Sequence, residues 1–152
     1  MLKGVKLASV LAVASLALAA CGSSGETAES PAPVETVPAA AVVKVGMAYD
    51  QEGKGDGSFN DAAFAGLSKA QADLGVEIKE VSSGAGATDA AREELLTLLA
   101  DGGYNPVIAI GFAYSTALTT VAPKFPDTTF AIVDSVVESP NVGSLIFAAE
   151  QG

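Results

Sequence analysis

From Val42 onward, short apolar runs alternate with longer segments whose apolar positions recur at helical spacing. The short runs are rich in β-branched residues, which is typical of strands buried on both faces of a sheet. The alternation predicts an α/β fold with a doubly wound parallel sheet. The predicted strands are Val42–Tyr49, Val76–Val81, Pro106–Gly111, Thr128–Asp134 and Asn141–Ala148. The predicted helices are Phe59–Leu74, the segment from Thr88 or Asp89 to Gly102-Gly103, and Tyr114–Val121.

The ends and faces of the helices can be predicted in more detail. Ser58 and Asp61 form a capping pair for the first helix. Gly75 is expected to end that helix, and Pro123 is expected to stop the third one. The inward face is predicted to contain Ala62, Ala63, Gly66, Leu67, Ala70 and Leu74 in the first helix and Leu95, Leu98 and Leu99 in the second.

The N-terminal residues follow another pattern. Met1–Lys6 is basic and Leu7–Ala20 is apolar and rich in small residues, which predicts a signal peptide over residues 1–20. Leu18-Ala19-Ala20-Cys21 matches a bacterial lipobox, so Cys21 is the predicted lipidation site that anchors the chain to the extracytoplasmic side of the cell membrane. Ordinary cleavage beside an incidental cysteine is the alternative. Residues 21–41 are rich in Gly, Ser and Pro and are expected to form a disordered tether before the folded lobe, residues 42–152.

Composition narrows the possible functions. The chain has no histidine and one cysteine, so it can form neither a Ser-His-Asp or Cys-His catalytic device nor an internal disulfide. Removal of the signal peptide leaves six basic residues against 18 acidic ones, a formal charge of −12. Nucleic acids bind clustered Lys and Arg, so no nucleic-acid partner is expected. Membrane affinity would have to come from the lipid.

Ligands of doubly wound sheets bind beyond the carboxyl ends of the strands. The loops expected there are Asp50–Asn60, Gly111–Tyr114 and Asp134-Ser135. The first is rich in glycine but is no phosphate loop, because Gly55 rather than Ser or Thr follows Lys54. Its three acids suggest calcium only weakly, since the order of an EF-hand is lacking. We therefore expect no metal and no cofactor.

Phe59 and Asn60 stand together where this loop enters the first predicted helix. An aromatic face can stack on a planar heterocycle, and an amide can hydrogen-bond the edge of that heterocycle. A structural role is equally open from spacing alone, with Phe59 in the core and Asn60 helping to cap the helix.

A longer motif surrounds this pair and resembles the basic membrane protein (BMP) family of substrate-binding lipoproteins, the nucleoside-binding components of ABC importers. Its specific part is the run Asp50, Gly53, Asp56, Ser58, Phe59 and Asn60, followed by Ala63–Leu67. Supporting matches are Gly102-Gly103-Tyr104, Gly111-Phe112, Val121-Ala122, Phe125-Pro126, Ile132–Asp134, Pro140–Val142 and Phe147–Gly152.

The resemblance implies the N-terminal lobe of a type I periplasmic-binding-protein fold, in which two hinged lobes close on a purine nucleoside. It implies that Phe59 stacks on the base and that Asn60 and Asp134 hydrogen-bond its edge. Asp50 and Tyr114 would line the same cleft. The implied partners are a small-molecule ligand and an ABC permease, and the implied role is transport rather than catalysis. Asp134 has an alternative role, since an acid at a strand end often caps the next turn.

No helix is predicted after Asn141–Ala148, so we expect the chain to be the front portion of a longer protein whose lone lobe binds weakly or not at all. A small complete five-stranded domain is the alternative. Three other functions stay open at this point. They are a receptor for a sugar or furanose-type signal, a flavin enzyme on the same sheet, and a surface antigen or adhesin without a small ligand.

Overall fold

A computed structural model of the protein describes residues 41–51 and 53–148. The predicted signal peptide, the lipidation site Cys21 and almost all of the tether lie outside the described residues. The elements, in chain order, are β1 (Lys44–Tyr49), α1 (Phe59–Leu74), β2 (Glu77–Ser82), α2 (Asp89–Asp101), β3 (Val107–Ile110), the 3₁₀ helix η1 (Phe112–Tyr114), α3 (Ser115–Val121), the 3₁₀ helix η2 (Ala122–Lys124), β4 (Phe130–Val133) and β5 (Val142–Leu145).

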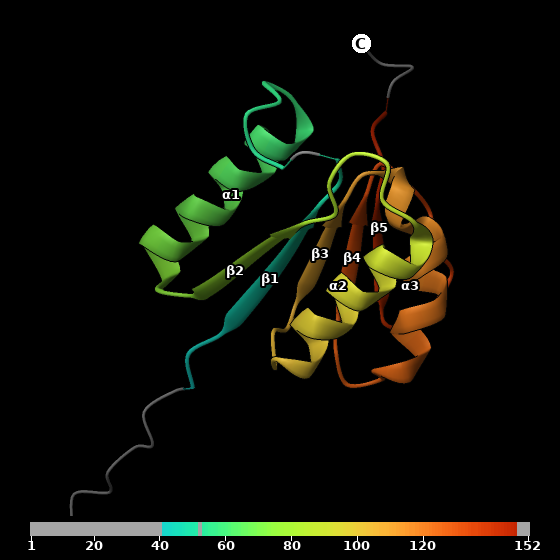
Figure 1. The fold of residues 1–152 in the computed structure, drawn as a ribbon. Coiled ribbons are helices and arrows are strands. Elements are labelled where there is room, and N and C mark those ends of the chain that lie inside the picture. The colour runs from blue at the N-terminus through green and yellow to red at the C-terminus, as the bar shows by residue number, and fades with distance from the viewer. Residues whose placement is uncertain (1–40, 52, 149–152) are drawn as a thin grey trace, which may run out of the picture. The chain divides into compact units, whose positions relative to one another are not determined.

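The sheet contains five parallel strands in the order β2-β1-β3-β4-β5 (Figure 1). The predicted α/β class and doubly wound parallel sheet are therefore confirmed. Every predicted strand and helix is present, and the ends differ by at most three residues. The α-helix α3 stops before Pro123, as predicted, but the chain continues as η2 with Pro123 in its first turn. Proline is tolerated there because the first turn of a helix does not need the N–H that proline lacks.

The helices cover the two faces of the sheet unequally. Side chains along a strand point alternately to opposite faces. Ala48, Ala109 and Ile132 lie in register and belong to the apolar cluster that includes α2 and α3. Their neighbours Met47 and Ile108 point to the other face, where α1 packs. Two helices therefore cover one face and one helix covers the other (Figure 1).

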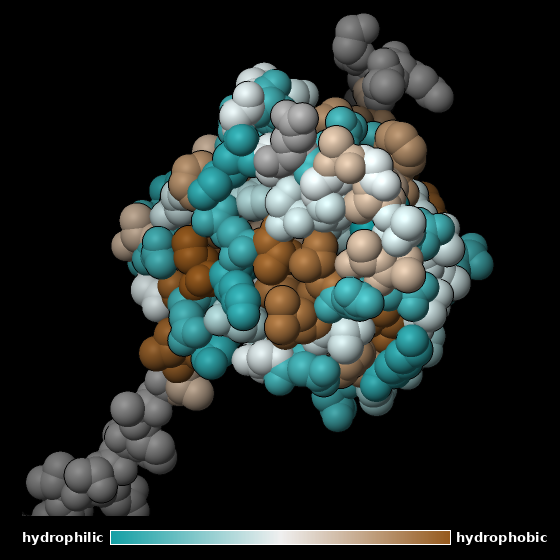
Figure 2. All heavy atoms as spheres, in the orientation of Figure 1, coloured by the Kyte–Doolittle hydropathy of each residue, from teal (hydrophilic) through white to brown (hydrophobic). Residues whose placement is uncertain are grey.

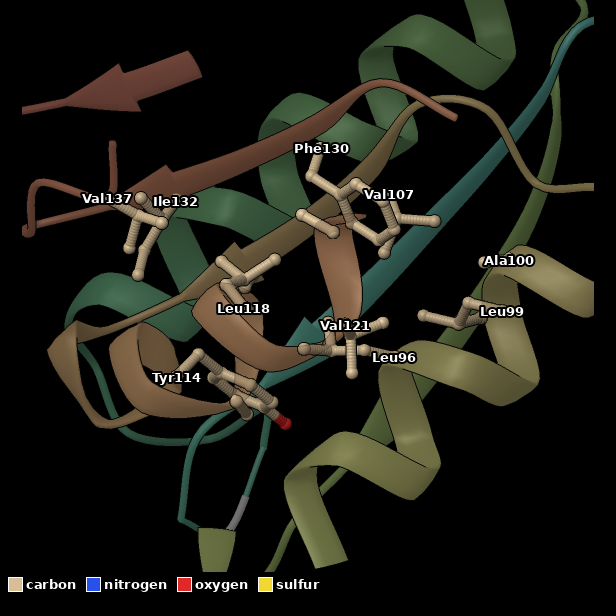
Figure 3. Close-up of a cluster of buried hydrophobic side chains, with 14 residues drawn as sticks. Leu96, Leu99, Ala100, Val107, Tyr114, Leu118, Val121, Phe130, Ile132 and Val137 are labelled. Carbon is tan, nitrogen blue, oxygen red and sulfur yellow. The ribbon is translucent and has the colours of Figure 1, made fainter. Parts of the chain in front are cut away.

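The larger cluster is the main core and is drawn in Figure 3. Phe130 of β4 belongs to it and is fully buried. Leu99 of α2 points inward as predicted, but Leu98 is exposed and Leu96 takes the inward position. The reason is geometric: Leu96 and Leu99 are three residues apart and share the side of α2 that meets α3.

The packing of α1 also differs from the prediction. Leu67 is buried and Ala63 and Ala70 are partly buried, whereas Ala62, Gly66 and Leu74 of the predicted inward face are exposed. Gly75 ends the helix as predicted, in the left-handed conformation (φ 67°) that favours glycine, and its N–H donates to the carbonyl oxygen of Gln71. The helix is thus held to the sheet along a narrow stripe.

Apolar surface remains open on this unit. Hydrophilic side chains dominate the margins of the face shown in Figure 2, and an apolar patch lies at its middle. At the edge of the sheet, Leu145 of β5 points to the face that α1 covers and is 55% exposed. Parallel sheets ordinarily have both faces covered.

Truncation of the buried core residue Phe130 should destabilise the fold strongly. We expect Phe130→Ala to lower the free energy of unfolding by about 3–5 kcal/mol, because it removes a buried ring and leaves a cavity. Urea titration of the full chain, followed by circular dichroism, measures this change. Phe112→Ala is the matched control, since that ring is 69% exposed, and should change stability by less than about 0.5 kcal/mol. Equal effects of the two substitutions would contradict the assigned core.

Candidate ligand-binding site

The carboxyl ends of β1, β3 and β4 meet at one edge of the sheet, because these strands are parallel neighbours. β2 and β3 lie on opposite sides of β1, so the chain reverses direction across the sheet at β1, which is where ligands of doubly wound sheets bind. Asp50, directly after β1, lies against Gly111, directly after β3. A Cβ atom on Gly111 would clash with the Asp50 carboxylate, and its φ of 96° also favours glycine.

A pocket of about 290 Å³ opens at this edge. It is formed by the loop after β1 and the first residues of α1, and it contains three of the predicted site residues, Asp50, Phe59 and Asn60. The described residues that line it are Asp50, Gln51, Gly53, Lys54, Gly55, Asp56, Ser58, Phe59 and Asn60.

Asn60 is the most unusual of these residues, because it is polar and only 3% exposed. Its Nδ2 donates to Asp50 Oδ1 over 3.3 Å, and its Oδ1 has no hydrogen-bond partner. An ionised carboxylate only accepts hydrogen bonds, so Asp50 fixes the amide with its NH₂ group toward the carboxylate. The buried carbonyl oxygen is left without a donor, and burial of an unpaired acceptor is costly.

Phe59 precedes Asn60 and is 48% exposed. Its ring centroid lies 5.4 Å from that of Phe147, with the two planes tilted by 44°. This is the ordinary geometry of an attractive aromatic pair. Phe147 follows β5, and the sequence analysis used it only as part of a supporting match to the BMP family. Its contact with Phe59 joins positions far apart in the chain, so no local pattern predicted it.

The start of α1 is capped differently from the prediction. The Ser58 side chain makes no capping hydrogen bond. Instead, the Asp56 carboxylate accepts from the backbone N–H groups of Ser58, Asn60 and Asp61 at 2.9, 3.0 and 3.1 Å. Hydrogen bonds from the backbone, that of Asn60 first, lower the pKa of Asp56. Asp56 thereby fixes the backbone on both sides of Phe59, including that of Asn60.

The loop is also tied down in two other places. The Asp61 carboxylate accepts from the backbone N–H groups of Gly55 and Gly57 at 2.7 and 2.8 Å. Lys54 pairs with Glu80 of β2 at 3.0 Å, and the buried Tyr49 hydroxyl donates to the same carboxylate at 2.7 Å. Burial, and then the hydrogen bond to Glu80, raise the pKa of Tyr49.

Tyr114 does not line the pocket. Its side chain is fully buried in the main core, and its hydroxyl donates to the carbonyl oxygen of Tyr49 at 2.9 Å. Burial raises the pKa of the phenol. The expected place of Tyr114 in the cleft is corrected, because the ring is fully buried in this structure. Its hydroxyl instead supports the end of β1.

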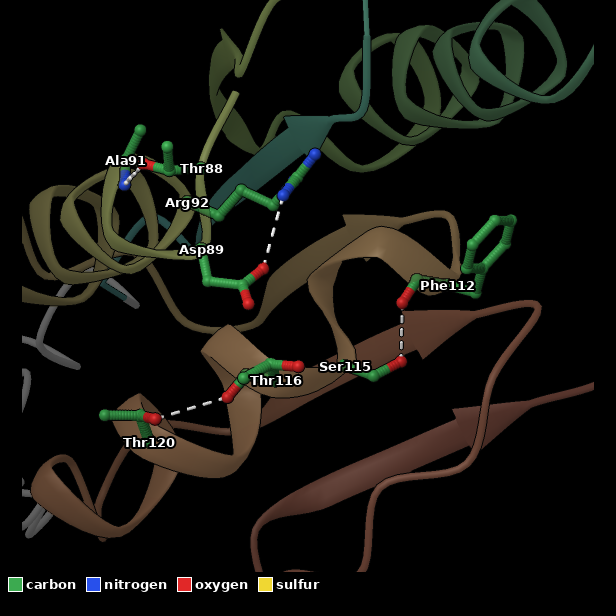
Figure 4. Close-up of polar contacts among 8 residues, drawn as sticks. All are labelled: Thr88, Asp89, Ala91, Arg92, Phe112, Ser115, Thr116 and Thr120. Atoms are coloured by element: carbon green, nitrogen blue, oxygen red, sulfur yellow. Dashed lines mark hydrogen bonds and ion pairs between the residues drawn. The ribbon is translucent and has the colours of Figure 1, made fainter. Parts of the chain in front are cut away.

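Asp134 lies at the end of β4 with an exposed side chain and a φ of 66°. Its backbone N–H donates to the carbonyl oxygen of Leu145, so the residue turns the chain while its carboxylate stays at the carboxyl edge. Next to it, Ser135 Oγ lies 2.7 Å from Ser115 Oγ, which also contacts the carbonyl oxygen of Phe112 (Figure 4). Asp134 does not belong to the pocket lined by Asn60.

Within residues 41–51 and 53–148, no group of three or more His, Cys, Asp or Glu residues is placed to hold a metal ion. No helix of that described part is long and apolar enough to cross a membrane.

Comparison with known proteins assigns most of the chain to a family. Residues 42–152 match the family model Bmp, described as ABC transporter substrate-binding protein PnrA-like. The chain belongs to the Bmp family. The resemblance found from the Ser58-Phe59-Asn60 motif is therefore confirmed.

Individual relatives agree with this assignment. An uncharacterized lipoprotein of Pyrococcus horikoshii is 33% identical over 115 residues, which is 72% of this chain and 27% of that protein. One of Pyrococcus furiosus is 38% identical over 97 residues, 61% of this chain and 23% of that protein. The solved solute-binding protein of Aeropyrum pernix K1 shares 30% identity with a TM-score of 0.60, over 67% of this chain and 28% of that one. This Bmp chain thus spans about a quarter of the length of these relatives.

The cap on α1 predicts a pH dependence. The folded pKa of Asp56 is lower than its unfolded value of about 3.9, so its carboxylate stabilises the fold above that pH. This contribution is lost as the pH falls through the folded pKa. We therefore expect Asp56→Asn to destabilise the full chain at pH 7 and the gap to the wild type to shrink by pH 3. Denaturant titrations across this range measure the gap.

The control for this prediction is Asp127→Asn, an exposed aspartate between η2 and β4. It should leave stability at pH 7 within about 0.5 kcal/mol of the wild type. A gap for Asp56→Asn that stays constant between pH 7 and pH 3 would mean that the carboxylate charge has no part in capping α1.

Proposed function

We propose that this Bmp chain is a lobe of a lipid-anchored solute receptor, that its pocket binds the base of a purine nucleoside, and that the receptor delivers the nucleoside to an ABC permease. The observation that carries the proposal is the buried, unpaired Oδ1 of Asn60 next to the half-exposed ring of Phe59. The coarser assignment, a substrate-binding protein of the ABC transporter class, follows from the family.

The chemistry of this pair defines what the ligand must offer. The Asn60 oxygen needs a donor, because it has no hydrogen-bond partner, while the amide nitrogen already donates to Asp50. The exposed face of Phe59 needs a flat partner, and stacking of a base on an aromatic ring contributes about 1–3 kcal/mol. A purine supplies both features, since its plane can stack while an N–H group at its edge donates to Asn60.

The acids of the carboxyl edge have separate roles in this proposal. Asp50 orients the amide of Asn60 through the 3.3 Å hydrogen bond. Asp134 hydrogen-bonds the edge of the base or the ribose from the end of β4. Asp56 acts indirectly, by holding the backbone of Asn60.

A single lobe should bind this ligand weakly. Sites of this class usually bury 70–90% of the ligand surface, which requires walls on several sides. The described walls of the pocket come from one loop and the start of one helix. About three quarters of each relative lies outside the matched segment, and this additional chain can supply the remaining contacts.

Titration of the isotope-labelled full chain with inosine, followed by NMR, tests the proposal. We expect shift changes centred on Phe59 and Asn60 and a dissociation constant on the order of 1 mM, equivalent to about −4 kcal/mol. Phe59→Ala should weaken binding by about fivefold or more, in line with lost stacking. Leu74→Ala removes an exposed apolar side chain at the other end of α1, outside the pocket, and should change nothing.

Several results would contradict the proposal. If the NMR signals of the pocket residues did not shift on addition of inosine, base binding would be excluded. If ribose bound as tightly as inosine, the result would favour a sugar receptor. A micromolar dissociation constant would show that one lobe is sufficient. The sugar receptor remains the second candidate, because a pyranose or furanose can also stack on Phe59 and donate a hydroxyl to Asn60.

Membrane anchoring belongs to the same proposal and rests on the lipobox and on relatives that are named lipoproteins. After expression in a bacterial host, we expect mass spectrometry to find a mature N-terminus at Cys21 that carries a diacylglyceryl group. Cys21→Ala should abolish both the lipid and the cleavage after Ala20, whereas Ser24→Ala should change neither. A wild-type chain cleaved before Cys21 without lipid would contradict the anchor.

A further inference from the structure

The ligand pocket has two walls that come from different parts of the chain. The loop wall, residues 50, 51 and 53–56, follows β1, and the helix wall, residues 58–60, opens α1. The proposed ligand contacts, Phe59 and Asn60, lie on the helix wall. The distance between the two walls therefore decides how a ligand fits, and the contacts that fix this distance lie partly outside the pocket.

The helix side of the loop is fixed by local contacts. The carboxylates of Asp56 and Asp61 accept backbone N–H groups from residues that are at most six positions away in the chain. These hydrogen bonds shape the end of the loop but do not connect it to the sheet. The residues before them need a separate attachment, since Gly53 and Gly55 give this stretch of backbone large conformational freedom.

That attachment is at the carboxyl end of β2. The Ser82 hydroxyl donates to the carbonyl oxygen of Gln51 at 2.9 Å. Lys54 Nζ lies 3.0 and 3.1 Å from the two carboxylate oxygens of Glu80. Side chains two positions apart on a strand point to the same face, so Glu80 and Ser82 hold the loop from one side of β2. Lys54 is the only cation among the described residues that line the pocket.

The Lys54 ammonium also contacts α1. Its Nζ lies 3.9 Å from the ring centroid of Phe64, which is a close cation–π contact. Phe64 is four residues after Asn60 and therefore lies on the same side of the helix. The Glu80 carboxylate is in turn fixed by the Tyr49 hydroxyl, which donates to it at 2.7 Å. One ammonium group thus joins the loop to both β2 and α1.

We propose that Glu80 and Phe64 form a seat for the Lys54 ammonium, and that this lysine seat sets the distance between the loop wall and the helix wall of the pocket. Lys54 and Glu80 are then positioning residues, which act on a ligand through the placement of Phe59 and Asn60. The inference rests on the proposed ligand pocket. A pocket held in this way is formed before the ligand arrives, so binding does not have to order the loop.

The lysine seat should affect the loop far more than the whole fold. Side chains of Lys54 and Glu80 are 43% and 23% exposed, and ion pairs at such positions add little to global stability. Loss of the pair should therefore loosen residues 50–56 locally while the free energy of unfolding stays nearly constant. A purely structural role would change both quantities together.

NMR of the isotope-labelled full chain without ligand tests the seat. The Lys54 methylene protons next to Nζ should be shifted upfield, because they lie over the Phe64 ring. Glu80→Gln keeps an acceptor for the Tyr49 hydroxyl but removes the charge. We expect it to abolish this upfield shift and to speed amide exchange at the buried Gly53 at least fivefold, with an unchanged urea midpoint. Lys54→Met should speed the exchange equally, and Lys54→Arg should restore slow exchange because it keeps a cation.

Lys69→Met is the matched control, since Lys69 also pairs with an acid, Asp73, but lies on α1 away from the pocket. It should change neither the exchange at Gly53 nor ligand binding. In the inosine titration, Glu80→Gln should raise the dissociation constant at least threefold.

Three results would overturn the lysine seat. They are unchanged exchange at Gly53 in Glu80→Gln, faster exchange that is matched by an equal loss of global stability, and a loosened loop that binds inosine as tightly as the wild type. Absence of inosine binding to the wild type would instead reject the proposed function alone, because the upfield shift and the exchange rates are measured without ligand.

Discussion

The packing of a parallel sheet that must be covered on both faces determines most of this structure. Because β1, β3 and β4 run in the same direction, their side chains alternate between two apolar layers and their carboxyl ends converge on one edge. The layer beneath α2 and α3 is complete and buries Phe130 entirely. The layer beneath α1 is partial. The pocket at the end of the strands and the incomplete layer beneath α1 are therefore two consequences of one arrangement.

The pocket itself depends on backbone hydrogen bonds to two carboxylates. Asp56 and Asp61 together accept five backbone N–H groups of the loop and the first turn of α1. This network fixes a loop rich in glycine, whose conformational freedom would otherwise be large. Asp50, directly after β1, then orients the Asn60 amide by a hydrogen bond. These carboxylates therefore hold the shape of the loop.

Local patterns predicted what depends on local forces. Apolar periodicity located the strands and helices, Gly75 ended α1, and the Ser58-Phe59-Asn60 run led to the family. The errors arose where distant segments decide. Leu96 rather than Leu98 points inward because α3 packs there, and Tyr114 is buried against β1. The helix cap is a local exception: Asp56, two residues before Ser58, accepts the backbone N–H groups that Ser58 was expected to cap. Phe147 joins Phe59 across most of the folded chain, and no spacing rule predicts such a contact.

Helix α1 connects the pocket to the apolar layer on its own face of the sheet, since Phe59 and Asn60 lie in its first turn and Leu67 belongs to that layer. Any group that packed against this layer beside α1 would confine the helix and with it the orientation of Phe59 and Asn60. Thermodynamic linkage then makes the effect mutual: a partner that favours the ligand-binding position of α1 is itself bound more tightly when ligand is present, by the same factor. If the pocket binds a solute as proposed, solute binding and packing against α1 form one coupled equilibrium.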